Sequence, residues 1–212
     1  MIYGALVFAA FGMTACGEQE AEEKNEETKE KKAEKVEYVL DKDATELGWV
    51  GSWVVPGEDG KMEEAKNHTG NVTISEGKMT VIGDDVKGSF TVDMSSIVVT
   101  DLEEEEGKGK LEGHLQSEDF FKVEDYAKVT VALNSLKDGV ADITINVIGI
   151  EVNDKVEVET SMEGDKMMMH GEFAIDFAAL SMPMTSPDPE KPEEGNVNPE
   201  IKFHLHAVLN KK

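Results

Sequence analysis

Metal-binding residue types stand at alternate positions near the C-terminus. His204 and His206 are separated by one residue, which places both imidazoles on one face of a strand, opposite Phe203 and Leu205. Imidazole is a common zinc and copper ligand, and two such side chains can share one ion. Two ligands do not complete a site, and an outward sheet face is usually solvated. We therefore expect no metal site at this pair.

Methionines and a further histidine form a second group. The run Met167 to His170, together with Met182 and Met184, carries the thioether ligands that select Cu(I). Strand alternation would send Met168 and His170 to the face away from the other two methionines of the run. Copper or zinc binding by these Met and His residues is thus an alternative function and not the leading one.

Groups that could catalyse a reaction are sparse. His114 and Asp119 lie close in the sequence, but catalysis by them would need a nucleophile and an oriented partner. The sequence has no Gly-x-Ser-x-Gly, no His-Glu-x-x-His and no phosphate-binding glycine loop. We predict that His114 anchors a loop, that Glu103 to Glu106 form a solvated loop, and that the protein is not an enzyme.

Cys16 is the only cysteine, so no disulfide can form within the chain. It follows residues 2–15, which are uncharged and mostly apolar. That run is too short to span a bilayer as a helix and suits a secretory signal. Met13 to Gly17 resembles a bacterial lipobox, in which cleavage precedes an acylated cysteine. The resemblance implies that residues 1–16 are a lipoprotein signal segment and that Cys16 carries lipid.

Charge is the strongest compositional signal. Residues 17–37 are mostly Glu, Lys, Gln, Asn and Ala, so they offer little apolar surface to bury and are predicted to form a disordered acidic tether. The net charge of the chain is -24, which opposes nucleic-acid phosphates and excludes nucleic acid as a partner. The lipobox resemblance also implies a location in the bacterial cell envelope, lipid-anchored on the periplasmic side or the cell surface. Two further alternatives remain. The protein could be a structural or interaction domain whose acidic surface recruits a basic partner, and it could form a homodimer.

The segment from residue 38 to 212 is predicted to be all-β. Short β-branched runs alternate with Gly, Asn and Asp, which is typical of an antiparallel sandwich or barrel. Hairpin turns are predicted at Ser75 to Lys78 and at Glu163 to Asp165.

Two longer connections interrupt this pattern. Leu102 to Asp119 is predicted to be a crossover with a turn of helix, with Ser117 as its N-cap. Residues 182–199 carry five of the six prolines and are predicted to be irregular and exposed.

Two sequence blocks carry a resemblance to a known family. They are Ser89 to Ile97, SFTVDMSSI, and Gly107 to Phe121, GKGKLEGHLQSEDFF, preceded by Gly48-Trp49 and His68-Thr69-Gly70. They resemble the YceI-like family, the lipid- or polyisoprenoid-binding, lipocalin-like domain of bacterial envelopes. The resemblance implies an extended antiparallel β-barrel of about eight strands with a short helical crossover. It also implies a bound isoprenoid quinone or polyprenyl lipid and no other cofactor.

Strand alternation predicts which side chains would line a ligand cavity. The candidates are Trp49, Trp53, Phe90, Val92, Met94, Val131, Leu133, Met169, Phe173, Ile175, Phe177, Phe203 and Leu205. An eight-stranded barrel can hold a ligand or fill its interior with side chains, so alternation alone leaves both readings open. Trp49 and Trp53 share a face and either line the mouth or plug one end.

Overall fold

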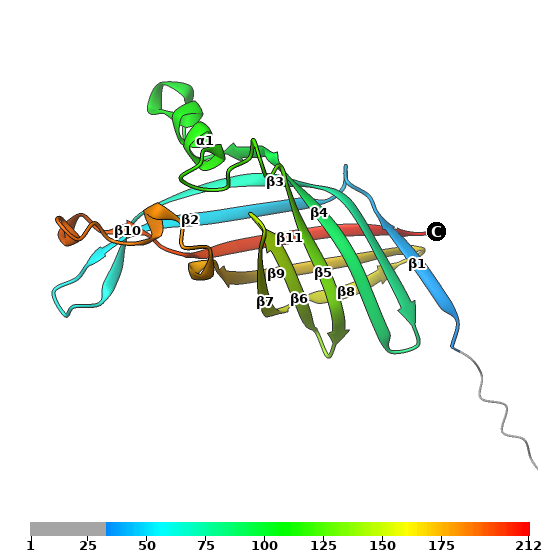
Figure 1. Cartoon of the computed structure of the whole chain (residues 1–212). Coiled ribbons are helices and arrows are strands. Elements are labelled where there is room, and N and C mark those ends of the chain that lie inside the picture. The colour runs from blue at the N-terminus through cyan, green and yellow to red at the C-terminus, as the bar shows by residue number, and fades with distance from the viewer. Residues whose placement is uncertain (1–32) are drawn as a thin grey trace, which may run out of the picture. The chain divides into compact units, whose positions relative to one another are not determined.

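The structure, a computed structural model, describes residues 33–212. This part of the chain is mostly antiparallel sheet with one α-helix (Figure 1). The strands are β1 (Lys35–Leu40), β2 (Glu46–Pro56), β3 (Met62–Ile82), β4 (Asp85–Val99), β5 (Lys128–Lys137), β6 (Val140–Val147), β7 (Ile150–Glu157), β8 (Glu159–Glu163), β9 (Lys166–Asp176), β10 (Asn196–Val197) and β11 (Glu200–Lys211). The signal segment, Cys16 and residues 17–32 of the expected tether lie outside the described residues, and β1 begins at Lys35.

The sheet closes into a ring, and at two places in this ring two consecutive strands share one position. β2 pairs with the first half of β3 and with β11, whereas β1 pairs with the last part of β3 and with the end of β11. In the same way β7 pairs with β6, and β8 pairs with β9, with Val158 between them. With β1/β2 and β7/β8 as one position each, the ring is β1/β2, β3, β4, β5, β6, β7/β8, β9 and β11. The predicted antiparallel barrel of about eight strands is therefore confirmed.

The first hairpin predicted from the sequence is wrong. The chain passes straight through Ser75 to Lys78 within β3 and turns only at Gly83, and the β3–β4 register shifts between Ile74 and Glu76. A Cβ on Gly77 would lie 2.6 Å from Cδ1 of Phe90, so the glycine serves close packing instead of a turn. A polar stretch with a glycine marks an irregularity in the strand here, as it does at many β-bulges.

The other predicted connections are confirmed, with one correction. The hairpin at Glu163 to Asp165 joins β8 and β9. The crossover contains a 3₁₀ turn, η1 (Glu104–Glu106), and α1 (Lys108–Gln116). Ser117 ends α1 as its C-cap and does not begin it, because its hydroxyl donates to the His114 carbonyl at 2.7 Å. The N-cap is Gly107, at φ 99°.

The proline-rich segment is irregular, as predicted, but it packs against the barrel. It holds η3 (Pro183–Thr185), η4 (Pro192–Glu194) and β10, and follows η2 (Ala178–Leu180). Met182 and Asn196 are buried, and the Trp53 indole donates to the Glu194 carbonyl at 2.8 Å. Among residues 33–212, no helix is long and apolar enough to cross a membrane.

Candidate functional site

The barrel interior contains a cavity of about 660 Å³. Inward side chains of the strands line it, and nearly all of them are apolar. All thirteen residues that alternation named as cavity candidates lie along it. The volume falls within the range of natural ligand pockets, which is about 300–1,000 Å³. Of the two readings left open by the sequence, a barrel with room inside is the one that the structure has.

Strand β6 supplies part of the wall that the sequence interpretation omitted. Ile143, Ile145 and Val147 alternate along β6, are buried and line the cavity. Their signal in the sequence is the period-two alternation of the segment VADITINV. Val156 and Val158 extend the same wall through the β7/β8 position.

A glycine seats the large aromatic side chain in the wall. Trp49 on β2 faces Gly70 on β3, and a Cβ on Gly70 would overlap both the Trp49 indole and the carbonyl oxygen of Val98. Trp49 is 7% exposed, so it is part of the wall. Its Nε1 is buried without a hydrogen-bond partner among the described residues.

Aromatic rings gather on the neighbouring part of the wall, where Phe203 of β11 is the register partner of Trp49. The ring centroids of Phe173 and Phe203 lie 5.9 Å apart, and those of Phe177 and Phe203 lie 6.3 Å apart. All three rings line the cavity, which gives this part of it a broad apolar surface with little conformational freedom.

Polar groups lie at one end of the cavity, close to α1 and the proline-rich segment. Lys66 and His68 of β3 and His114 of α1 line it there, together with Trp53. His114 packs edge-on against Phe120, with ring centroids 5.0 Å apart, and its Nε2 lies 3.6 Å from Oδ2 of Asp119. These groups form a polar rim around an otherwise apolar space.

Asp101 fixes one part of this rim. Its Oδ2 lies 2.9 Å from Nδ1 of His68, and its Oδ1 accepts the backbone N–H of Thr69 at 3.0 Å. Partial burial raises the pKa of Asp101, but the hydrogen bonds from Thr69 and His68 outweigh this effect and hold its pKa below the ordinary value. The carboxylate form is therefore the one that orients His68.

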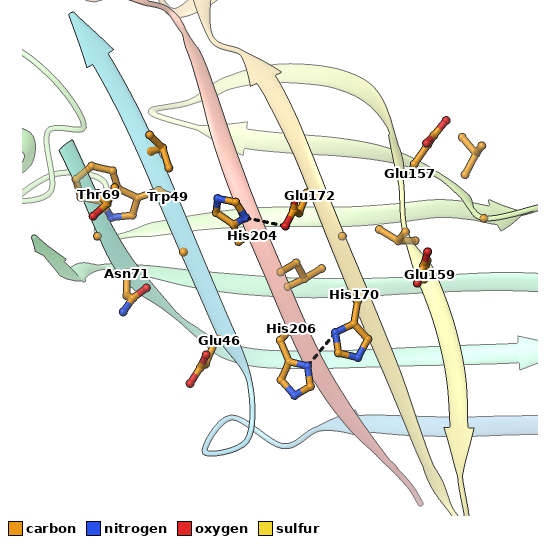
Figure 2. Close-up of a pocket in the computed structure, with 18 of the residues that line it drawn as sticks. Glu46, Trp49, Thr69, Asn71, Glu157, Glu159, His170, Glu172, His204 and His206 are labelled. Atoms are coloured by element: carbon orange, nitrogen blue, oxygen red, sulfur yellow. Dashed lines mark hydrogen bonds and ion pairs between the residues drawn. The ribbon is translucent and has the colours of Figure 1, made fainter. Parts of the chain in front are cut away.

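A second hollow, of about 990 Å³, lies on the outer surface (Figure 2). His204 and His206 line it, while Phe203 and Leu205 line the interior cavity, so the predicted alternation holds. His170 also lies on this outer side, and it is the partner of His206 in the β9–β11 register. The sequence interpretation missed this pairing, because register between distant strands is not visible in local spacing.

The structure separates three of the methionines from these histidines. Met169, Met182 and Met184 line the interior cavity, on the other side of the wall from His170. Among residues 33–212, no group of three or more His, Cys, Asp or Glu side chains is arranged to hold a metal ion.

Comparison with known proteins gives a family match and a fold match. A family model, the YceI-like domain, matches residues 38–209. BcnA of Burkholderia cenocepacia has a solved structure that is 14% identical, with a TM-score of 0.51, covering 80% of this chain and 98% of that chain. The Campylobacter jejuni YceI protein is 17% identical with a TM-score of 0.44, covering 59% and 72%. No curated protein matches the sequence. At this identity, the likeness to BcnA shows a shared fold.

Proposed function

The chain belongs to the YceI-like family, and from that premise we propose that it binds a long-chain apolar lipid inside its barrel. The observation that carries the proposal is the interior cavity of about 660 Å³ with its nearly continuous apolar lining. An isoprenoid quinone or a polyprenyl lipid fits this chemistry, because its tail offers many apolar carbons and few groups that need hydrogen bonds.

The energetics favour such a ligand. Each methylene group that leaves water for an apolar site contributes about 0.8 kcal/mol. Loss of translational freedom and ordering of the tail oppose binding. A tail of several isoprene units can exceed those costs without any precisely placed polar partner. Selection among ligands would then depend on length and shape.

The polar rim gives the ligand a direction. Lys66, His68 and His114 lie at one end of the cavity, whereas nearly all of the remaining lining is apolar. A polar head group placed at that end keeps its hydrogen bonds, and the tail extends along the rings of Phe173 and Phe203. The same rim lacks a positioned nucleophile in the described residues, so we propose binding without catalysis.

We further propose that the protein is exported and anchored through Cys16. The support is the lipobox-like segment Met13 to Gly17 and the charged stretch after it. An anchor would keep the barrel near the membrane that holds its ligand.

Organic extraction followed by mass spectrometry tests the binding proposal. The full chain is produced in a bacterial host, purified and extracted with organic solvent. The proposal predicts a long-chain lipid at close to one molecule per chain. Protein that is folded, exposed to membranes throughout expression and free of lipid would contradict it.

A further inference from the structure

The outer face of the barrel carries an imidazole pair for which lipid binding has no use. His170 of β9 and His206 of β11 are cross-strand partners, with their Nδ1 atoms 3.1 Å apart and their ring centroids 4.5 Å apart. Figure 2 shows the two rings facing each other across the two strands. One Nδ1–H donates to the other Nδ1, so the strands hold both nitrogens close together before any ligand arrives.

We propose that this pair chelates a divalent transition-metal ion, with Zn²⁺ or Cu²⁺ as the fitting chemistry. Both ions bind imidazole nitrogen, and zinc does so at about 2.0–2.1 Å. Two nitrogens 3.1 Å apart can both reach one ion at that distance, with an N–metal–N angle of roughly 100°. A rotation about the soft χ2 torsion of each ring turns both lone pairs toward the ion.

The exchange balances without a redox step. The hydrated ion releases two water ligands and forms two nitrogen–metal bonds, which replace the single hydrogen bond between the rings. The proton on the donating Nδ1 moves to Nε2 of the same ring, which makes both histidines Nε2–H tautomers. Each imidazole stays neutral, and no net proton is released.

Carboxylates flank the pair in the same row of the sheet. Glu159 of β8 is the register partner of His170, and Glu46 of β2 is that of His206. All four side chains line the outer hollow, in the order Glu, His, His, Glu across four strands (Figure 2). Directly opposed residues have Cβ atoms about 4.5–5.5 Å apart, so a glutamate rotamer can bring an oxygen to the ion. The imidazoles are the preformed part of the site, and a carboxylate and water complete it.

A neighbouring histidine provides a matched control. His204 lines the same hollow, but its Nδ1 lies 3.5 Å from Oε1 of Glu172. The replacement His204→Gln therefore removes an imidazole from the same strand and the same surface without touching the pair.

A zinc titration of the unlipidated full chain, with the Cys16 thiol alkylated, tests the proposal. Calorimetry gives the affinity and stoichiometry, and ¹⁵N NMR of the histidine rings identifies the liganding nitrogens. We expect one Zn²⁺ per chain, with the ring nitrogens of His170 and His206 shifting and those of His68 unchanged. His170→Gln and His206→Gln should each weaken binding by at least about tenfold. His204→Gln should keep the affinity of the unchanged chain.

Two results would overturn the proposal. One is the absence of saturable binding up to about 1 mM zinc, a concentration that corresponds to a free energy of only about -4 kcal/mol. The other is binding that survives both His170→Gln and His206→Gln. Circular dichroism of each variant reports folding, and the ring shifts in the unchanged chain identify the ligands even where a variant fails to fold.

Discussion

Single residues set the shape of the cavity wall, and Gly70 is the clearest case. The indole of Trp49 occupies the space that a side chain at position 70 would need. The motif His68-Thr69-Gly70 thus combines three different tasks: His68 lies on the rim, Thr69 donates to Asp101, and Gly70 admits Trp49. The sequence located this motif, but the contact between positions 49 and 70 required the β2–β3 register.

Replacing Gly70 with alanine should destabilise the fold. The added methyl group must displace the Trp49 indole or the Val98 carbonyl, and overpacking of this kind costs about 1–3 kcal/mol. Urea unfolding measures the change. The control is Gly113→Ala in α1, where a Cβ meets nothing within 4 Å. Because alanine favours a helix more than glycine does, this replacement should raise the free energy of unfolding by about 0.5–1 kcal/mol. Equal effects of the two replacements would contradict the packing assigned to Gly70.

Asp101 should contribute stability that depends on pH. The pKa of Asp101 is lower in the folded protein than in the unfolded chain, where it is about 3.9. The stability that Asp101 contributes is therefore fully present above the unfolded pKa and is lost as the pH falls through the folded pKa. Asp101→Asn should lower the free energy of unfolding at pH 7, and the deficit should shrink at pH 3. Denaturation at the two pH values measures this, with Asp84→Asn, on the exposed β3–β4 turn, as the control. A deficit that is the same at both pH values would rule out the carboxylate as its cause.

At the level of elements, period-two alternation assigned the inward face of several strands correctly. It placed Phe90, Val92 and Met94 inside on β4, where the structure has them. It failed where a strand continues through polar residues: the Ser75 to Lys78 stretch has turn-like composition, yet β1, β4 and the ring of Phe90 hold it extended. It could not show the exchange of partners at Val158 or the pairing of His170 with His206, since both depend on register.

Alternation along β5 provides a direct contrast between the two faces. Val131 lines the cavity, and its neighbour Thr130 is exposed on the outside. Val131→Phe should fill part of the cavity and lower the amount of co-purifying lipid several-fold, whereas Thr130→Phe should leave it unchanged. Mass spectrometry of extracts from equal amounts of folded protein measures both. Equal lipid content in the two variants would place the lipid outside the barrel.

At the scale of the whole molecule, the family fold, the apolar interior and the proposed anchor all fit the proposed binding of a lipid close to a membrane. The sequence was sufficient to predict the barrel and its family, because the blocks at Ser89 to Ile97 and Gly107 to Phe121 are specific and strand alternation is regular. It could not determine whether the interior was filled, since inward apolar residues serve a core and a cavity equally. The interior volume depends on the diameter of the closed barrel and on the size of the side chains that point into it.

The anchor is a separate prediction at this scale. Cys16→Ser should remove the acyl group and move the protein from the membrane fraction to the soluble fraction, because a serine hydroxyl does not form the thioether. Cell fractionation with intact-mass measurement checks the change. Membrane association that persists in the variant, without any mass for acyl chains on the unchanged protein, would contradict a lipid anchor.

The central claim is that an apolar tail occupies the barrel, and methyl NMR of the full unlipidated chain tests it most directly. A polyprenyl lipid is added to protein with labelled Ile and Val methyl groups. We predict large shifts and contacts to the lipid at inward Val92, Ile143 and Ile145, and unchanged signals at the exposed side chains of Val39 and Val98. Shifts confined to the exposed methyl groups, with Val92, Ile143 and Ile145 unaffected, would contradict the account.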